Sequence, residues 1–456
     1  MPELALGLDI GTSSVKASAI TSAGQVFSAT SGTYPSANPF PGAVEQNPAD
    51  WVAACHEVLA KLLPELPEGP LTVGLTGQMH TSVLLDANQQ VLRPAILWSD
   101  QRATTQSEAL NQSVSGLADI TGNPLLPAFT AAHLQWVREH EPEVFARIDK
   151  VLNPKDYIRL RLGAGYATEP ADASGTALLD TRDDTWSSEM LAAVGLRVGQ
   201  LPEVVPSHQV TGRASLCGRR DAAVIGGAGD QAAQAVALGV REAGQLGLSL
   251  GTSGVAFGVW PQPIHGAFRH CYDKSWLRLD STHAAGLALT WLSELVGHPV
   301  SELTQAWVPP ETAPVFLPYL QGHRSGPGAP SACVGLSVQH GYEHLAYAAM
   351  EGVAFELDRL AREIITELPE VVQLGGGGAR SEKWRALLAT ALDRPVRFKD
   401  RDSSFGAAVL AAEAVGWHSE FESHDRTKAD MVEPIPELRK IIAERKRYFA
   451  QLNEIL

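Results

Sequence analysis

The sequence lacks the features that define several large classes of protein. It has four cysteines among 456 residues, and they lie far apart without a CxxC pair, which indicates neither a disulfide framework nor a cysteine-ligated zinc site. No apolar run approaches the roughly 18 residues that a membrane crossing needs, and no basic residue precedes Lys16, as a signal peptide would require. We therefore expect a cytoplasmic protein without a membrane partner.

Positive charge is also scarce. The chain has 36 Lys and Arg against 51 Asp and Glu, a net charge of −15. This balance repels nucleic acid unless a local basic patch overrides it. The one basic concentration, within residues 439–447, falls on an amphipathic helix, where a solvated face is expected. We predict no nucleic-acid partner.

Two familiar nucleotide-binding motifs are missing as well. There is no GxxxxGK[ST] segment, and the glycine run at residues 375–378 lacks GxGxxG spacing. This run follows a predicted strand at 371–374, and bare backbone of this kind suits a flat ring such as adenine. The alternative is a simple turn from strand to helix.

An internal repeat is the most informative feature that is present. Residues 8–15 (LDIGTSSV) and 248–255 (LSLGTSGV) share Leu, Gly, Thr, Ser and Val at a constant offset. Each copy predicts strand, turn and strand, and a small-residue linker at 240–244 precedes the second copy. We predict two related α/β domains, residues 1–242 and 243–456.

The spacing of apolar residues and the positions of turn and capping residues predict the main elements around these repeats. The first three strands are expected at 4–9, 15–20 and 25–29, as an antiparallel meander. A helix should begin behind Asn47, and a long central helix should span 342–368.

The two repeated turns are candidates for phosphate binding, because their backbone amides and hydroxyls suit phosphate oxygens. Asp9, just before the first turn, is a candidate ligand of Mg²⁺, which prefers carboxylates and phosphates; alternatively it only caps the turn. Ser249 takes its place in the second copy. The turns are expected to clamp one polyphosphate across an interdomain cleft. The predicted phosphate residues are Gly11, Thr12, Ser13, Gly251, Thr252 and Ser253.

Asp230 is the candidate general base. It follows a predicted strand at 222–225 and a run of small residues that lets a substrate approach closely. The start of an Ala-rich helix should keep the carboxylate ionised and able to accept a proton from a hydroxyl. The alternative role is a helix N-cap, which does not exclude the first.

One further pattern points to a different chemistry. Residues 340–344 (HGYEH) match the HxxEH of a class of zinc peptidases. We reject this interpretation, because the segment is typical of a glycine turn at a helix start and no downstream acidic ligand is evident.

Taken together, the motifs resemble the FGGY carbohydrate kinase family over nearly the whole chain. They occur in the family's order and approximate spacing: residues 9–12, 77–80, 97–102, 229–231, 250–253 and 375–377. The resemblance implies two ribonuclease-H-like domains of the actin-type ATPase fold around an interdomain cleft. It also implies ATP and Mg²⁺ as cofactors, a small-molecule sugar as substrate, and a homodimer as the expected assembly.

Within the family the sequence is most similar to the members that phosphorylate D-xylulose, on residues 79–86, 93–98, 154–161 and 173–176. That resemblance implies that Asp230 takes the proton from O5 of D-xylulose and that Asp9 organises Mg²⁺. It implies nucleotide contacts from Gly376 and Gly377. The implied sugar-binding residues are Met79, His80, Trp98 and Gln231.

Three positions depart from the pattern of that subfamily. Gln231 replaces a frequent Asn, His133 a common Lys and His323 a usual Glu, and Gly-Asp-Gln also occurs in glycerol kinases. Two alternatives therefore remain open: a kinase for another polyol or ketose, of glycerol or ribulose type, and a non-enzymatic actin-type ATPase module.

Overall fold

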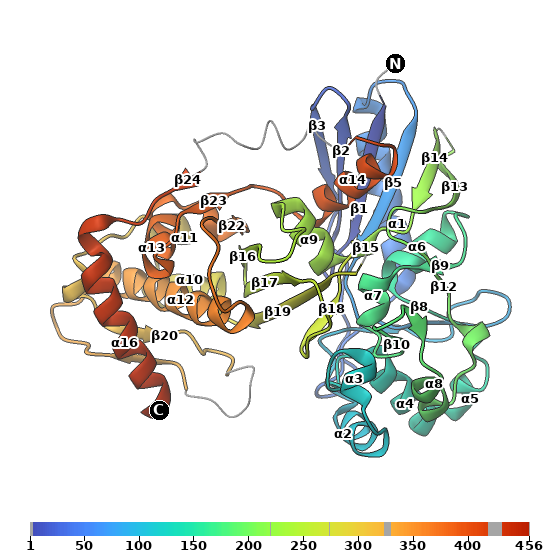
Figure 1. Cartoon of the computed structure of the whole chain (residues 1–456), viewed down its shortest axis with the longest axis horizontal. Helices are drawn as coiled ribbons and strands as arrows, with labels where there is room; N and C mark the ends of the chain where they lie inside the picture. The colour runs from blue at the N-terminus through green and yellow to red at the C-terminus, as the bar shows by residue number, and fades with distance from the viewer. Residues whose placement is uncertain (1–2, 219, 273, 323–329, 418–430, 456) are drawn as a thin grey trace. The chain divides into compact units, whose positions relative to one another are not determined.

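The computed structural model describes residues 3–218, 220–272, 274–322, 330–417 and 431–455. They form two compact mixed α/β units, as the sequence predicts (Figure 1). The first unit holds the described residues within 1–237, 260–277 and 402–425, and the second those within 238–259, 278–401 and 426–456. The predicted boundary between residues 242 and 243 stays a prediction.

The first unit is built on a sheet of strand order β13-β14-β5-β1-β2-β3, with β15 paired to β5. Strand β1 lies antiparallel to β2 and parallel to β5, and the predicted meander is confirmed to within one residue at each end. The strands are β1 Leu4–Ile10, β2 Val15–Thr21, β3 Val26–Thr30, β5 Leu71–Gly77, β13 Val210–Leu216, β14 Arg220–Ile225 and β15 Ala228–Gly229.

Helix α14, Ser403–Ala414, packs on β1, β5 and β2 of this sheet, so a late segment of the chain covers its earliest strands (Figure 1). Two glycines make the approach possible. A Cβ atom at Gly7 would lie 1.8 Å from the Ser404 carbonyl oxygen, and one at Gly74 would lie 2.2 Å from the Ala407 carbonyl oxygen. A larger residue at either of these two positions would push the helix off the sheet.

Helix α1, Pro48–Leu62, begins where the sequence predicts. The Asn47 side chain accepts a hydrogen bond from the backbone amide of Ala49, and proline follows the cap. Trp51, Cys55, Val58 and Leu62 are buried along one face, which joins the helix to the core of the first unit.

Short elements of the first unit lie between β5 and β13, apart from β4, which precedes β5. The helices are α2 Thr104–Ser113, α3 Leu117–Thr121, α4 Thr130–His140, α5 Pro142–Phe145, α6 Pro154–Arg161, α7 Pro170–Ser174 and α8 Ser188–Val194. Small strand pairs lie between them: β4 Glu45–Gln46 with β7 Ala95–Ile96, β6 Val83–Leu85 with β8 Lys150–Leu152, β9 Ala167–Thr168 with β12 Glu203–Val204, and β10 Leu179–Asp180 with β11 Thr185–Trp186.

The second unit has its own sheet, of order β19-β17-β16-β22-β23-β24. Strand β16 lies antiparallel to β17 and parallel to β22, so the predicted repeat recurs as the same three-stranded arrangement. The strands are β16 Leu246–Leu250, β17 Gly254–Trp260, β19 Trp276–Thr282, β22 Val372–Gly375, β23 Val396–Phe398 and β24 Met431–Val432.

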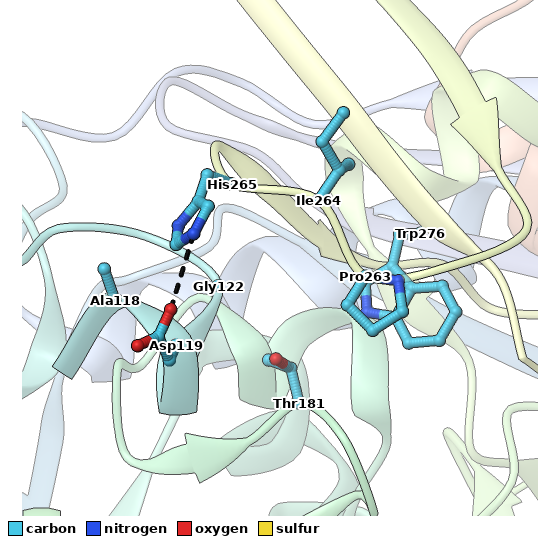
Figure 2. Close-up of a pocket in the computed structure, with 8 residues that line it drawn as sticks. All are labelled: Ala118, Asp119, Gly122, Thr181, Pro263, Ile264, His265 and Trp276. Carbon is cyan, nitrogen blue, oxygen red and sulfur yellow. Dashed lines mark ion pairs between the residues drawn. The ribbon is translucent and has the colours of Figure 1, made fainter. Parts of the chain in front are cut away.

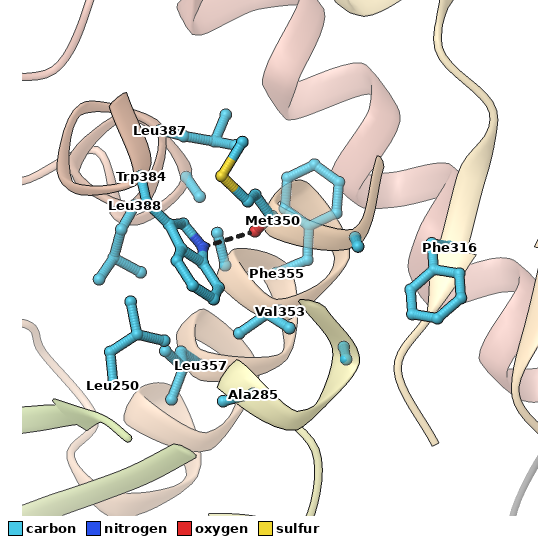
Figure 3. Close-up of a cluster of buried hydrophobic side chains, with 14 of the residues drawn as sticks. Leu250, Ala285, Phe316, Met350, Val353, Phe355, Leu357, Trp384, Leu387 and Leu388 are labelled. Atoms are coloured by element: carbon cyan, nitrogen blue, oxygen red, sulfur yellow. Dashed lines mark hydrogen bonds between the residues drawn. The ribbon is translucent and has the colours of Figure 1, made fainter. Parts of the chain in front are cut away.

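Helices pack against one another to form the core of this unit. Figure 3 shows Trp384 and Leu388 of α13 facing Leu357 of α12, with the Trp384 indole N–H donating to the Met350 carbonyl oxygen at 3.0 Å. The main helices are α10 Gly286–Val296, α12 Tyr342–Ile364, α13 Glu382–Leu392 and α16 Arg439–Ile455. Among the described helices, none combines the length and the apolar composition that a bilayer crossing requires.

Candidate active site

Asp9 lies at the end of β1 and is almost fully buried. Its Oδ2 accepts a hydrogen bond of 2.6 Å from the Ser403 hydroxyl at the start of α14, whereas its buried Oδ1 has no hydrogen-bond partner. Burial raises the pKa of Asp9 to about 6. The Ser403 hydrogen bond and Lys16 lower this pKa, and the Asp402 charge raises it further.

The unpartnered Oδ1 fits a divalent metal ion. A buried carboxylate oxygen without a donor is costly, and a hard oxygen of this kind is a ligand that such ions prefer. No group of three or more His, Cys, Asp or Glu in the described parts of the chain is arranged to hold a metal. An ion at Asp9 would therefore complete its coordination with phosphate oxygens and water.

Asp230 follows β15 and begins α9, Asp230–Leu238. Gly229 is paired with Gly77 of β5, and Gly77 is paired with Ile10 of β1, so Asp230 and Asp9 come from the same edge of one sheet.

Burial, together with the negative charge of Asp9, raises the pKa of Asp230 to about 7, while hydrogen bonds from Gln231 lower it. The expectation that the helix start keeps this carboxylate ionised is therefore wrong, because burial and Asp9 outweigh it. A carboxyl group that titrates near neutrality suits general-base chemistry.

Two of the predicted sugar residues, Gln231 and Met79, contact Asp230 or the loop before it, and His80 follows Met79 in the chain. Gln231 donates to Asp230. Met79 is buried against the preceding loop, because a Cβ atom on Gly229 would lie 2.9 Å from the Met79 Sδ. His80 has a positive φ of 65° and stacks on Phe129 at 4.6 Å between ring centroids.

A hydrogen bond fixes which ring nitrogen of His80 carries a proton. Its Nδ1 lies 2.5 Å from the Gly175 carbonyl oxygen, which can only accept, so Nδ1 carries the proton. In the neutral ring, Nε2 is then an acceptor.

Trp98, the fourth predicted sugar residue, is joined to the first phosphate turn. Its indole N–H donates to the Thr12 hydroxyl at 3.0 Å, and this hydroxyl lies 3.5 Å from Gln78 Oε1. Gln46 Nε2 donates to the Thr12 carbonyl oxygen at 2.7 Å. The turn and Trp98 thus share one network, to which Gln46 and Gln78 belong although sequence reasoning assigned them no role.

The second turn is held by backbone instead. The Gly251 amide donates to the Ser253 carbonyl oxygen at 3.0 Å, and the Gly251 carbonyl oxygen accepts from the Gly286 amide at 2.8 Å. The Thr252 carbonyl oxygen accepts from the Ala285 and Leu287 amides at the start of α10, both at 3.0 Å.

The glycine run lies beside this turn. Gly376 has φ 92°, and a Cβ atom there would lie 2.6 Å from the Leu250 carbonyl group, so only glycine fits. A Cβ atom on Gly377 would meet nothing within 4 Å. The structure therefore places Gly376 beside the second turn, with open space at Gly377.

Two of the three departures from the family pattern fall on described residues. His133 is fully buried, and burial lowers its pKa to about 3, so its ring is neutral, with an unpartnered Nε2. Gln231 contacts Asp230. His323 lies outside the described residues.

The HxxEH segment starts a helix, as expected. The His340 Nδ1 accepts from the Ser337 amide at 3.0 Å, and the His344 Nδ1 accepts from the Gly341 amide at 3.3 Å. Both nitrogens thus satisfy backbone donors around the first turn of α12, which supports the rejection of a zinc peptidase.

A separate pocket in the first unit contains none of the predicted site residues (Figure 2). His265 and Asp119 form an exposed ion pair of 3.4 Å at its rim. Its other lining residues are Ala118, Gly122, Thr181, Pro263, Ile264 and Trp276.

Comparison with known proteins agrees with this geometry. Models of the N-terminal and C-terminal domains of the FGGY family of carbohydrate kinases match residues 4–237 and 246–415. The chain is 38% identical to a xylulose kinase of Escherichia coli K12 over 431 residues, 89% of each chain. It is 37% identical to a xylulose kinase of Klebsiella pneumoniae over 456 residues, 94% of this chain and 92% of the other.

A solved structure leads to the same family. The crystal structure of a "xyloylose kinase" from Brucella ovis superposes with a TM-score of 0.90 at 35% identity, covering 99% of each chain. The chain therefore belongs to the FGGY family of carbohydrate kinases, which implies ATP and a sugar as its substrates and a divalent metal as its cofactor.

Proposed function

We propose that this protein transfers the γ-phosphoryl group of ATP to O5 of D-xylulose, with Asp230 as the general base. The carrying observation is the pair of carboxyl groups at one sheet edge, Asp9 with a buried unpartnered oxygen and Asp230 with a pKa of about 7. The choice of D-xylulose is supported by relatives named xylulose kinases that are 37–38% identical over most of the chain.

In the proposed reaction, Asp230 accepts the proton of the O5 hydroxyl while the O5–phosphorus bond forms and ADP leaves. The proton ends on the Asp230 carboxyl group. Because phosphoryl transfer is mostly positioning and charge neutralisation, one base of this kind contributes about 10²–10⁴-fold.

The remaining predicted residues supply positioning. Met79, His80, Trp98 and Gln231 hold the sugar in the first unit. The two Gly-Thr-Ser turns hold phosphate oxygens, and Gly376 with Gly377 contacts the nucleotide. Asp9 holds Mg²⁺, which neutralises the phosphate charge when bound.

The test is a substrate panel with purified protein, ATP and Mg²⁺, scored as sugar-stimulated ADP formation. We expect D-xylulose to give the highest kcat/KM, ahead of D-ribulose and glycerol, because pocket differences act on the transition state. A preference for glycerol or ribulose would overturn the assignment of the sugar. Nucleotide binding without sugar-stimulated turnover would favour the non-enzymatic ATPase module.

Two further expectations rest on the sequence and the family resemblance. We propose a homodimer, to be tested by light scattering coupled to size exclusion, and a cytoplasmic location, to be tested by fractionation of the source cell.

A further inference from the structure

A cluster of five ionisable side chains is buried in the first unit, and one of them, Asp172, lies beside Gly229. Each is at most 1% exposed. Charges this deep cost several kcal/mol apiece unless they are paired. Three belong to the 154–161 segment, which carries part of the family resemblance but has no role so far. The five are Lys155, Asp156 and Arg159 of α6 with Glu169 and Asp172 at α7.

Lys155 gathers the three carboxyl groups. Its Nζ lies 2.7 Å from Asp156 Oδ1, 3.3 Å from Asp172 Oδ2 and 3.6 Å from Glu169 Oε1. Glu169 also caps α7 by accepting from the amides of Ala171 and Asp172 at 2.7 and 2.9 Å. The three carboxyl groups are therefore held around the Lys155 ammonium group.

Arg159 directs its guanidinium toward the loop that leads to Asp230. Its Nη1 donates to the Ile225 carbonyl oxygen and its Nη2 to the Gly226 carbonyl oxygen, both at 2.7 Å. Nη1 also donates to the Thr211 hydroxyl at 2.7 Å. Bonds from an ionised donor are among the strongest in proteins, and they grip the chain four to five residues before Asp230.

The same loop is held by other contacts. The Gly226 amide donates to the Gln209 carbonyl oxygen and the Gly227 amide to the Ser207 carbonyl oxygen, both at 2.9 Å. At Gly229, a Cβ atom would lie 2.9 Å from Met79 and 3.4 Å from the Cα of Asp172. The loop is thus fixed between Arg159 and the residues predicted to bind the sugar.

We propose that Arg159 is a positioning residue, which fixes loop 225–229 and thereby places the Asp230 carboxyl group against Met79 and Asp9. The guanidinium Nε lies 3.6 Å from Asp156 Oδ1. Burial lowers the pKa of Arg159, and the negative charges of Asp156, Glu169 and Asp172 raise it. The proposal rests on the proposed function in so far as Asp230 is the base, whereas the position of the loop can be measured separately.

The decisive variant is Arg159→Lys, which keeps the charge but cannot donate in parallel to both carbonyl groups. We expect kcat to fall by about 10- to 100-fold, since a displacement of about 1 Å can cost 10²-fold, with the KM for ATP within about twofold. The matched control is Arg161→Lys on the same helix, where the guanidinium contacts Tyr157 and the Gln89 carbonyl oxygen; it should leave kcat unchanged.

The pH profile separates positioning from mere loss of folded enzyme. A displaced Asp230 lies farther from Asp9 and closer to water, so the acid limb of kcat/KM should move to lower pH. Partial unfolding would scale the profile without moving it. Thr211→Val removes one acceptor of Arg159 in a nearly isosteric way and should give a smaller shift, so it decides the question if Arg159→Lys does not fold.

Hydrogen exchange of the Gly226 and Gly227 amides supplies a readout that does not depend on catalysis. We expect Arg159→Lys to speed exchange at both amides and Arg161→Lys to leave it unchanged. Wild-type exchange, kcat and pH profile in Arg159→Lys, or in Thr211→Val where the first does not fold, would overturn the proposal. Full activity of Asp230→Asn would instead overturn the proposed function. The hydrogen exchange of Gly226 and Gly227 would then still show whether Arg159 fixes the loop.

Discussion

The two strand-turn-strand hairpins, one in each sheet, share their antiparallel pairing but differ by one residue in turn length and in their chemistry. In each, the glycine amide of the turn donates within the turn, Gly11 to the Ser14 carbonyl oxygen at 3.2 Å and Gly251 to that of Ser253 at 3.0 Å. The residue that precedes the turn differs. Asp9 stands in the first hairpin where Ser249 stands in the second, so only the first can supply a carboxylate.

The surroundings of the turns differ in the same sense. Side chains hold the first turn: the Tyr34 hydroxyl donates to the Gly11 carbonyl oxygen, and the Thr12 hydroxyl accepts from Trp98. Backbone amides at the start of α10 hold the second, through Thr252. The first turn is thus bonded to Trp98, a residue predicted to bind sugar. The second turn is held by backbone hydrogen bonds.

The largest expected effect comes from removing the base of the first unit. Asp230→Asn should lower sugar-dependent kcat by about 10²–10⁴-fold, the usual contribution of a general base, with ATP affinity within about twofold. Steady-state ADP release and nucleotide titration measure the two quantities. A loss below tenfold would contradict the base role.

Exchanging the distinguishing residue tests the comparison directly. Asp9→Asn should lower kcat by about 10²-fold and raise the Mg²⁺ concentration needed for half-maximal rate, because a metal contributes several kcal/mol to charge stabilisation. Ser249→Ala at the equivalent position should change neither by more than about twofold. Equal effects of the two substitutions would contradict the asymmetry.

The pH dependence of kcat/KM should also arise from carboxyl groups of the first unit. Asp230 must be ionised to act, so kcat/KM is expected to fall below about pH 7, by up to tenfold per pH unit. Asp9 raises this pKa, and Asp9→Asn should therefore move the limb to lower pH. An unchanged limb in that variant would show that another group controls it.

The same raised pKa values predict a stability cost. Burial disfavours the ionised forms of Asp9 and Asp230, so the folded protein bears the cost above their raised pKa values of about 6 and 7 and is relieved of it below the ordinary value near 4. Asp9→Asn should raise the free energy of unfolding at pH 8 by about 1–3 kcal/mol. Denaturant titrations at pH 8 and pH 4 measure the gain, which should vanish at pH 4.

The smallest expected effect separates the two turns. Thr12→Val removes the acceptor of the Trp98 indole and should raise the sugar KM by about fivefold, about 1 kcal/mol for one hydrogen bond. Thr252→Val should leave the sugar KM unchanged and raise the KM for ATP. A reversed pattern in steady-state kinetics would contradict the assignment of the turns.

Much of the frame could be predicted from local sequence. Alternating and helical spacing located β1, β2 and α1, and Asn47 marked the start of that helix, because each signal acts within a few residues. The repeat predicted the shared hairpin. Asp9 and Asp230 were found because each follows an apolar strand at a glycine-rich turn.

Long-range contacts could not be predicted in this way. Nothing in the periodicity of α14 shows that Gly7 and Gly74 make room for it, since the contact joins distant parts of the chain. Arg159 stood in the sequence only as part of residues 154–161, without a role, and the role we propose depends on carbonyl groups about 66 residues away. The pKa of Asp230 was misjudged because it depends on burial and on Asp9, which outweigh the helix start.

The most direct test of the account is the identity of the product. Purified protein with ATP, Mg²⁺ and D-xylulose should form ADP and D-xylulose 5-phosphate in equal amounts, with phosphorus-carbon coupling at C5 in the nuclear magnetic resonance spectrum. Asp230→Asn should form neither above about 1% of that rate. ADP without phosphorylated sugar, phosphate on another carbon, or an active Asp230→Asn would contradict the account.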